Sequence, residues 1–154
     1  MKPDLYKIIL IISILLFAVS LTQPAFYTSA RQPDGWANSV GLLLIGWTGT
    51  LVGGAGLAWI ANPLIFFAWT RFKKRKTAVV LSGIATIAAA SFLMFDSIIT
   101  GEDGNYSKIT ERKVGYWLWL ISIAVFFIGT TVSYFINDYQ KGYRANQNTN
   151  NNIQ

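Results

Sequence analysis

The sequence predicts an all-α membrane protein, a bundle of four transmembrane helices forming one domain over residues 1–140. Three observations support this fold class. The chain of 154 residues is 53% hydrophobic. It contains four apolar segments long enough to cross a bilayer, which takes about 20 helical residues. Its positive charge is concentrated beside these segments, as in membrane proteins. A chain of this length has no room for a soluble domain beside them.

The first apolar run follows Lys2 and Lys7 and predicts a helix over residues 6–22. A basic start followed by an apolar centre is also typical of a signal peptide. Small residues around Ala18 and Ser29 would suit a signal peptidase. We favour an uncleaved first span, and cleavage is the alternative. Residues 23–38, with two prolines, then predict a short loop on the outer side.

The chain is organised around the uncharged stretch of residues 35–70, which is too long for one straight span. We expect a long second helix that is broken near Gly53-Gly54, because glycine lowers helix propensity. Residues 40–51 would form its outer piece and residues 57–69 its inner piece. A re-entrant hairpin over residues 40–69 is the rival interpretation, and it would move everything that follows to the other side of the membrane.

Two features of this second helix are candidates for function or packing. The inner piece contains Trp59, Asn62 and Pro63. Pro63 removes a backbone donor and predicts a kink, and Asn62 could satisfy a carbonyl that the kink frees. Gly49 and Gly53 have the GxxxG spacing, which we expect to be a packing face.

A basic cluster follows this stretch and consists of Arg71, Lys73, Lys74, Arg75 and Lys76. Loops retained in the cytoplasm are enriched in Lys and Arg, so the cluster predicts a cytoplasmic loop and two cytoplasmic termini. Binding of anionic membrane lipids by the same residues is compatible with this topology. Topology therefore accounts for the net charge of +6, and we expect no nucleic acid as a partner.

The third span, residues 77–100, contains a helical face of small and polar residues that ends at Asp96: Ser82, Thr86, Ala89, Leu93 and Asp96. Asp96 is the only ionisable residue within an apolar run, and we expect it to point inward near the outer end of the span. Three roles stay open for it: an interfacial anchor, a structural pair with Arg31 or another outer cation, and proton or ion coupling.

Residues 101–113 predict a second outer loop with balanced charges, and residues 114–136 predict the fourth span. Aromatic residues at both ends of this span suit the two membrane interfaces. The last segment, residues 141–154, is rich in asparagine and predicts a disordered polar tail in the cytoplasm.

Three sequence boxes occur within the membrane region: Gly46-Trp47, Trp59-Ile60-Ala61-Asn62-Pro63-Leu64 and Gly115-Tyr116-Trp117-Leu118-Trp119. Together they resemble those of small bacterial four-span membrane proteins that remain uncharacterised. The resemblance implies a bacterial cytoplasmic membrane. It implies no activity, cofactor or catalytic residue.

The chain contains no cysteine and no histidine, which excludes thiol chemistry, His/Cys zinc sites and a histidine base. We predict no catalytic residue, metal site or cofactor. The leading hypothesis is a non-enzymatic assembly subunit or small regulator that contacts a partner membrane protein through its helices. The alternative is a small homo-oligomeric transporter or channel with a path near the break between Gly53 and Pro63 and near Asp96. A membrane-embedded enzyme ranks third.

Overall fold

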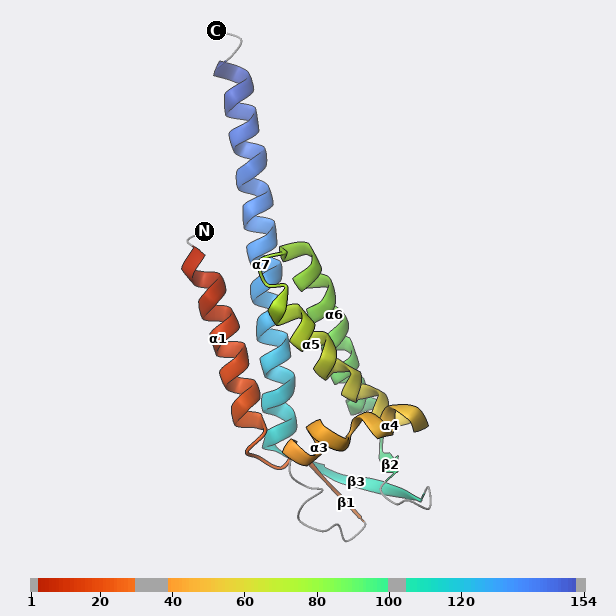
Figure 1. Cartoon of the computed structure of the whole chain (residues 1–154). Helices are drawn as coiled ribbons and strands as arrows, with labels where there is room; N and C mark the ends of the chain where they lie inside the picture. The colour runs from red at the N-terminus through yellow and green to blue at the C-terminus, as the bar shows by residue number, and fades with distance from the viewer. Residues whose placement is uncertain (1–2, 30–38, 100–104, 152–154) are drawn as a thin grey trace.

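The computed structural model describes residues 3–29, 39–99 and 105–151, and these residues are mostly helical (Figure 1). The elements within these ranges are α1 (Pro3–Ser20), β1 (Phe26–Thr28), α3 (Ser39–Ile45), α4 (Trp47–Val52), η1 (Gly54–Ile60), α5 (Ala61–Thr70), α6 (Arg75–Ser91), η2 (Phe92–Met94), β2 (Ser97–Ile99), β3 (Tyr106–Arg112) and α7 (Val114–Asn151). The two elements written η are 3-10 helices.

The longer helices lie side by side, with α7 packed against both α1 and α6, and α5 packed on α6 (Figure 1). The start of α1, the turn between α5 and α6 and the far part of α7 lie toward one end, which we call the terminal end. The strands and the short helices α3 and α4 lie at the opposite end, the sheet end. The Arg75 guanidinium stands 4.5 Å from the centre of the Tyr6 ring, which joins the basic cluster to the start of α1.

Small residues let the helices pack closely. The buried face of α6 consists of Ala78, Ser82, Ala85 and Ala89, spaced four, three and four residues apart. They pack into a core that includes Phe17, Ile65, Ile123 and Phe126. The predicted face is therefore correct for Ser82 and Ala89 and wrong for its outer members, because Leu93 and Asp96 follow the end of α6 and are exposed.

In the part of the chain that the structure describes, two helical segments are long and apolar enough to cross a membrane, namely Arg75–Met94 and Val114–Gln140. Two shorter apolar segments, Leu5–Ser20 and Gly54–Thr70, accompany them. The first and last predicted helices begin close to where the sequence places them, at Pro3 and Val114.

The prediction of a mostly helical protein is confirmed, but the fold is not entirely helical, because the sheet end contains a three-stranded antiparallel sheet in the order β1-β3-β2. In its register Phe26 faces Arg112, and Ile98 faces Ser107. The two supposed outer loops and the end of the supposed third span supply these strands. Ser107 and Ile109 are buried on β3 while their neighbours are exposed, an alternation typical of a half-covered strand.

The second helix does break at Gly53-Gly54, but its two pieces do not form one long span. Gly53 and Gly54 have φ values of 85° and 60°, which L-residues with a side chain rarely adopt. The chain turns back there, so that α4 lies against η1. The outer piece remains at the sheet end, whereas η1 and α5 run to the terminal end (Figure 1). Neither a straight broken span nor a simple re-entrant hairpin describes this path.

Pro63 does not interrupt a helix. It lies in the first turn of α5, three residues after the 3-10 helix ends at Ile60. A proline is tolerated in the first turn because the amide hydrogen that it lacks would have no partner within the helix. At the position of the expected kink, the chain instead changes from a 3-10 helix to an α-helix.

The polar tail also differs from the prediction, because α7 stays helical as far as Asn151. A helix satisfies its backbone hydrogen bonds within its own segment, so it can continue without a packing partner. This part of α7 projects beyond the other helices (Figure 1).

Candidate functional site

A cavity of about 900 Å³ lies at the sheet end, between the α3–α4 segment, η1 and the first turns of α7. Four of the six residues named as candidates for function or packing line it: Gly49, Gly53, Trp59 and Asn62. Pro63 and Asp96 are not among its lining residues. The cavity reaches the surface beside α4, where the lining residues Thr48 and Val52 are exposed.

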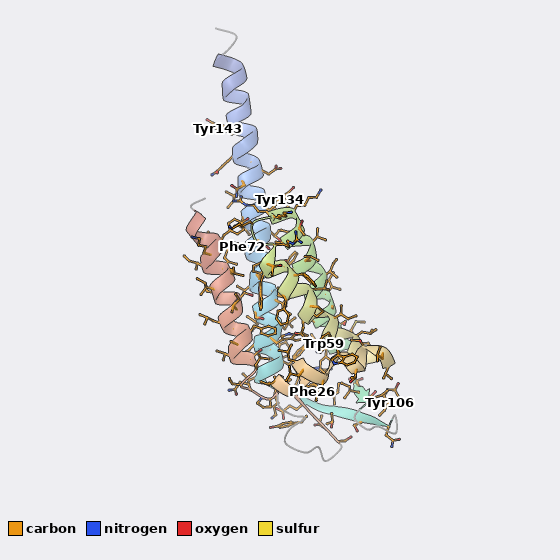
Figure 2. All side chains as sticks on the ribbon, in the orientation of Figure 1. Phe26, Trp59, Phe72, Tyr106, Tyr134 and Tyr143 are labelled. Carbon is orange, nitrogen blue, oxygen red and sulfur yellow. The ribbon has the colours of Figure 1, made fainter. Side chains whose placement is uncertain are left out.

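Trp59 fixes one wall of the cavity. Its indole Nε1 donates to the carbonyl oxygens of Leu42 and Leu43, both at 3.1 Å. These carbonyls belong to the last turn of α3, and the Leu42 carbonyl also accepts from the Gly46 amide at 2.8 Å. A Cβ at Gly46 would lie 2.6 Å from Trp59 Cδ1, so only glycine leaves room for the indole. Figure 2 shows Trp59 near the sheet end, above Phe26.

Asn62 forms part of the inner wall and is 6% exposed. Its Oδ1 accepts a hydrogen bond of 2.9 Å from the indole Nε1 of Trp119 on α7. An indole nitrogen can only donate, so the amide oxygen must face Trp119 and the amide nitrogen must point another way. Asn62 therefore joins α5 to α7, a role that differs from the predicted repair of a proline kink.

Asp96 does not point inward. Its side chain is exposed, in a bend between η2 and β2. Its backbone carbonyl accepts from the Ile109 amide at 2.8 Å, which begins the contact with β3. This position fits the interfacial reading of Asp96 better than a role inside the bundle. Arg31, the proposed partner, lies outside the described residues.

Arg112 is a residue that the sequence analysis missed. Its Nη2 donates to the carbonyl oxygens of Leu93 (3.2 Å) and Phe95 (2.9 Å). A cation at this position suits the negative end of the α6–η2 helix and satisfies carbonyls that the helix leaves free. No local sequence signal identifies it, because Arg112 and these carbonyls are about 20 residues apart and meet only through the sheet.

A second missed group joins three helices in the core. Ser13 Oγ on α1 donates to the Ser122 carbonyl of α7 at 2.8 Å and accepts from Trp69 Nε1 of α5 at 3.1 Å. The sequence indicates this group only through its residue types, because a buried indole or hydroxyl needs a hydrogen-bond partner.

The basic cluster lies at the terminal end, away from the cavity. Lys73 and Arg75 line a small polar cavity there together with Tyr134, Asn137 and Asp138 of α7. Figure 2 shows Phe72 and Tyr134 near one another at this end and Phe26 and Tyr106 at the other. Aromatic side chains therefore lie toward both ends of the bundle, as in membrane proteins with two interfaces.

Within residues 3–29, 39–99 and 105–151, those that line the larger cavity include no Asp, Glu, Lys or Arg. Among the described residues there is also no group of three His, Cys, Asp or Glu side chains that could hold a metal ion. The chemistry available in this cavity is therefore apolar contact and hydrogen bonding by neutral groups. Comparisons of the chain with protein-family models, with curated proteins and with solved structures found no match.

Proposed function

We propose that this chain is a four-span, non-enzymatic protein of a bacterial cytoplasmic membrane, which acts as an assembly subunit or small regulator by contacting a partner membrane protein. The observation that carries the proposal is its inverted polarity. Large aliphatic side chains cover the outside of the helices, while seven of the nine buried polar residues in the described part of the chain are serines. A water-soluble protein arranges these residues the other way round.

Helix α1 illustrates the inversion. Its exposed residues include Ile8, Ile11 and Leu15, whereas Ser13 and Ser20 are almost completely buried. In water, each exposed aliphatic side chain would forgo roughly 1.5–3 kcal/mol of burial free energy. Lipid tails remove this cost, and hydroxyl groups that bond across helices then become favourable contacts. The same pattern occurs on α6 and α7, where the exposed residues include Val80, Ile84, Ile87, Ile121, Ile128 and Val132.

The lengths of the two shorter segments support four spans. Helix α1 has 18 residues and is about 27 Å long at 1.5 Å per residue. The segment Gly54–Thr70 combines seven 3-10 residues with ten α-helical residues, which gives about 29 Å because the 3-10 helix rises about 2.0 Å per residue. Both values approach the ~30 Å thickness of the hydrocarbon core. The larger rise per residue of the 3-10 helix thus lengthens a segment that would be shorter if it were α-helical throughout.

The charge distribution supports cytoplasmic termini. The contact of Arg75 with Tyr6 joins the basic cluster to the start of α1, and the far part of α7 lies toward the same end (Figure 1). At the sheet end Lys113 is balanced by Glu111, with which it forms an ion pair. The positive-inside rule then favours the terminal end as the cytoplasmic end. Anionic lipids are the partners expected beside the cluster.

The surface for the partner protein is proposed to be α4. The small-residue faces are used within the chain, since the alanines of α6 pack in the core and Gly49 contacts Gly56. In contrast, α4 presents Trp47, Leu51 and Val52, all exposed, and Leu51 is 78% exposed. Large aliphatic and aromatic side chains on a short helix at the edge of the bundle suit a helix–helix contact with another membrane protein.

The test is purification from native membranes in mild detergent, with a tag at the C-terminus, followed by mass determination of the complex. We expect a stoichiometric foreign protein to co-purify and Leu51→Ser to remove it. The matched control is Ile87→Ser on α6, where the side chain is 73% exposed, and this variant should retain the partner. A clean homo-oligomer that neither substitution alters would contradict the proposal.

The second candidate function is a small homo-oligomeric transporter or channel, and the cavity beside the Gly53 turn favours it. A single protomer of this size encloses little volume, so a path would require a symmetric assembly. Purified protein in liposomes should then show solute flux that Asn62→Ala alters. Asp96→Asn should leave the flux unchanged, because Asp96 does not line the cavity. A panel of uncharged solutes that shows no flux above empty liposomes would count against this candidate.

A further inference from the structure

We infer that the cavity at the sheet end binds one uncharged, long-chain lipid-like molecule with a carbonyl or hydroxyl group at its head. Its volume of about 900 Å³ falls near the upper end of the range for small-molecule sites, roughly 300–1,000 Å³. This inference rests on the proposed location in a membrane, and it is independent of whether the chain acts as a subunit or a transporter.

The lack of charge in the described part of the wall determines the class of ligand. Among the residues that the structure describes, no acidic or basic residue lines the cavity. A carboxylate, phosphate or ammonium group would therefore lose its hydration there without gaining an opposite charge, which is costly in an apolar site. Phe17, Leu42, Phe92 and Ile98 line much of the wall and offer only apolar contact. An apolar chain suits this wall, and a charged metabolite does not.

The hydrogen-bonding groups of the cavity wall determine the head group of the ligand. Several donors in the wall are already bonded within the protein: Trp59 Nε1 to Leu42 and Leu43, Trp119 Nε1 to Asn62, Tyr116 Oη to Ala89, Ser20 Oγ to Phe17 and Ser39 Oγ to Gln23. Asn62 uses its oxygen for Trp119, so its amide nitrogen can donate to a ligand. The hydroxyl oxygens of Ser20 and Ser39 retain the capacity to accept. A neutral carbonyl or hydroxyl head matches both kinds of group.

The route of entry also suits a lipid. Two of the exposed lining residues, Thr48 and Val52, belong to α4, whose outer surface is apolar, and the others are Ile45, Gly54, Ser97 and Tyr106. A molecule dissolved in the adjacent leaflet could reach the cavity past α4 without crossing the polar surface of the sheet.

The test uses dibrominated monoolein, an uncharged single-chain lipid whose bromine atoms quench tryptophan at short range. The protein is purified in detergent with Trp36, Trp47 and Trp117 replaced by phenylalanine, so that Trp59 and Trp119, which line the cavity, are two of the three remaining tryptophans. We expect saturable quenching by this lipid. Dibromostearate, a related bromine-bearing chain with a carboxylate head, should require about tenfold more for half-saturation, because its charge has no partner in the wall.

Three substitutions separate the cavity from the general apolar surface. Ala55→Phe fills the cavity from a buried lining position and should abolish saturable quenching. Asn62→Leu should weaken binding roughly 2- to 10-fold, the value of one neutral hydrogen bond. The control Ile87→Phe, on the outer surface of α6 and away from the cavity, should change nothing. If Ala55→Phe does not fold, as judged by circular dichroism and gel filtration, Thr48→Phe at the exposed mouth replaces it.

Equal binding of the two brominated lipids would overturn the inference, and so would non-saturating quenching that Ile87→Phe changes as much as the cavity variants. Because the assay is performed in detergent, it does not depend on the orientation of the chain in a membrane. Failure to bind therefore remains distinguishable from failure of the proposed topology.

Discussion

Gly56 and Gly49 meet where α4 folds back onto η1, and the structure predicts opposite effects of alanine at the two positions. A Cβ at Gly56 would overlap the Gly49 carbonyl and lie 2.9 Å from Gly49 Cα. A Cβ at Gly49 would meet Gly56 Cα at 3.4 Å, an ordinary contact. The Gly56 methyl group points at rigid backbone, so α4 must move away, whereas the Gly49 methyl group fits.

The magnitudes follow from these contacts. Overpacking of a close interface costs about 1–3 kcal/mol, and alanine regains up to about 1 kcal/mol of backbone propensity over glycine. We therefore expect Gly56→Ala to destabilise by about 1–2 kcal/mol, and Gly49→Ala to be neutral or to stabilise by up to about 1 kcal/mol. The assay is unfolding by sodium dodecyl sulfate in mixed micelles, followed by tryptophan fluorescence. Equal stability of the two variants, or greater damage from Gly49→Ala, would refute this account of the turn.

Three further substitutions test contacts at the sheet end and in the core. A double-mutant cycle of Asn62→Leu and Trp119→Phe should give a coupling free energy of about 0.6–1.7 kcal/mol in the same unfolding assay, and a value indistinguishable from zero would contradict the bond between α5 and α7. Arg112→Gln should destabilise by about 1–2 kcal/mol, because it removes a cation from the carbonyls at the end of the α6–η2 helix; a variant as stable as the wild type would contradict that role. Asp96→Asn should stay within about 0.5 kcal/mol of the wild type, since its side chain is exposed, and loss of folded protein would show that the carboxylate has a structural partner. Ser13→Ala should cost about 0.6–1.7 kcal/mol, the range for hydrogen bonds between membrane helices, and no measurable loss would indicate that water or another hydroxyl replaces Ser13.

The features that depend on local sequence were predicted well. The fourth helix begins at Val114 as expected, and the second helix breaks at the expected glycine pair because both residues adopt positive φ. Apolar run length and glycine propensity are properties of neighbouring residues, so they can be read from the sequence. They do not indicate the direction in which the chain continues after a break.

The features that depend on distant contacts could not be predicted in the same way. The fold-back of α4 requires the contact between Gly49 and Gly56. The GxxxG spacing had instead predicted a packing face formed by Gly49 and Gly53. Helix α6 ends at Ser91 because Phe95 is extended and β2 pairs with β3. This strand pairing takes Asp96 off the helical face on which the periodicity had placed it. The alternation along β3 was the one local signal of the sheet, and we interpreted that segment as a loop.

The candidate site was predicted only in part. Asn62 stood out as a polar residue beside the expected kink, with Trp59 in the same segment, and both line the cavity. Their partners, the α3 carbonyls and Trp119, lie 16 to 57 residues away. Spacing along one helix contains no information on such pairs, so the cavity itself could be found only from the structure.

The most direct test of the central claim is labelling of single cysteines with a membrane-impermeant maleimide in intact cells. The chain has no cysteine of its own, so the unmodified protein is the blank. We expect Asn105→Cys at the sheet end to react in intact cells and Lys74→Cys in the basic cluster to react only after permeabilisation. The reverse pattern would contradict the topology, and protection of both positions in intact cells would contradict exposure of the sheet end outside the membrane.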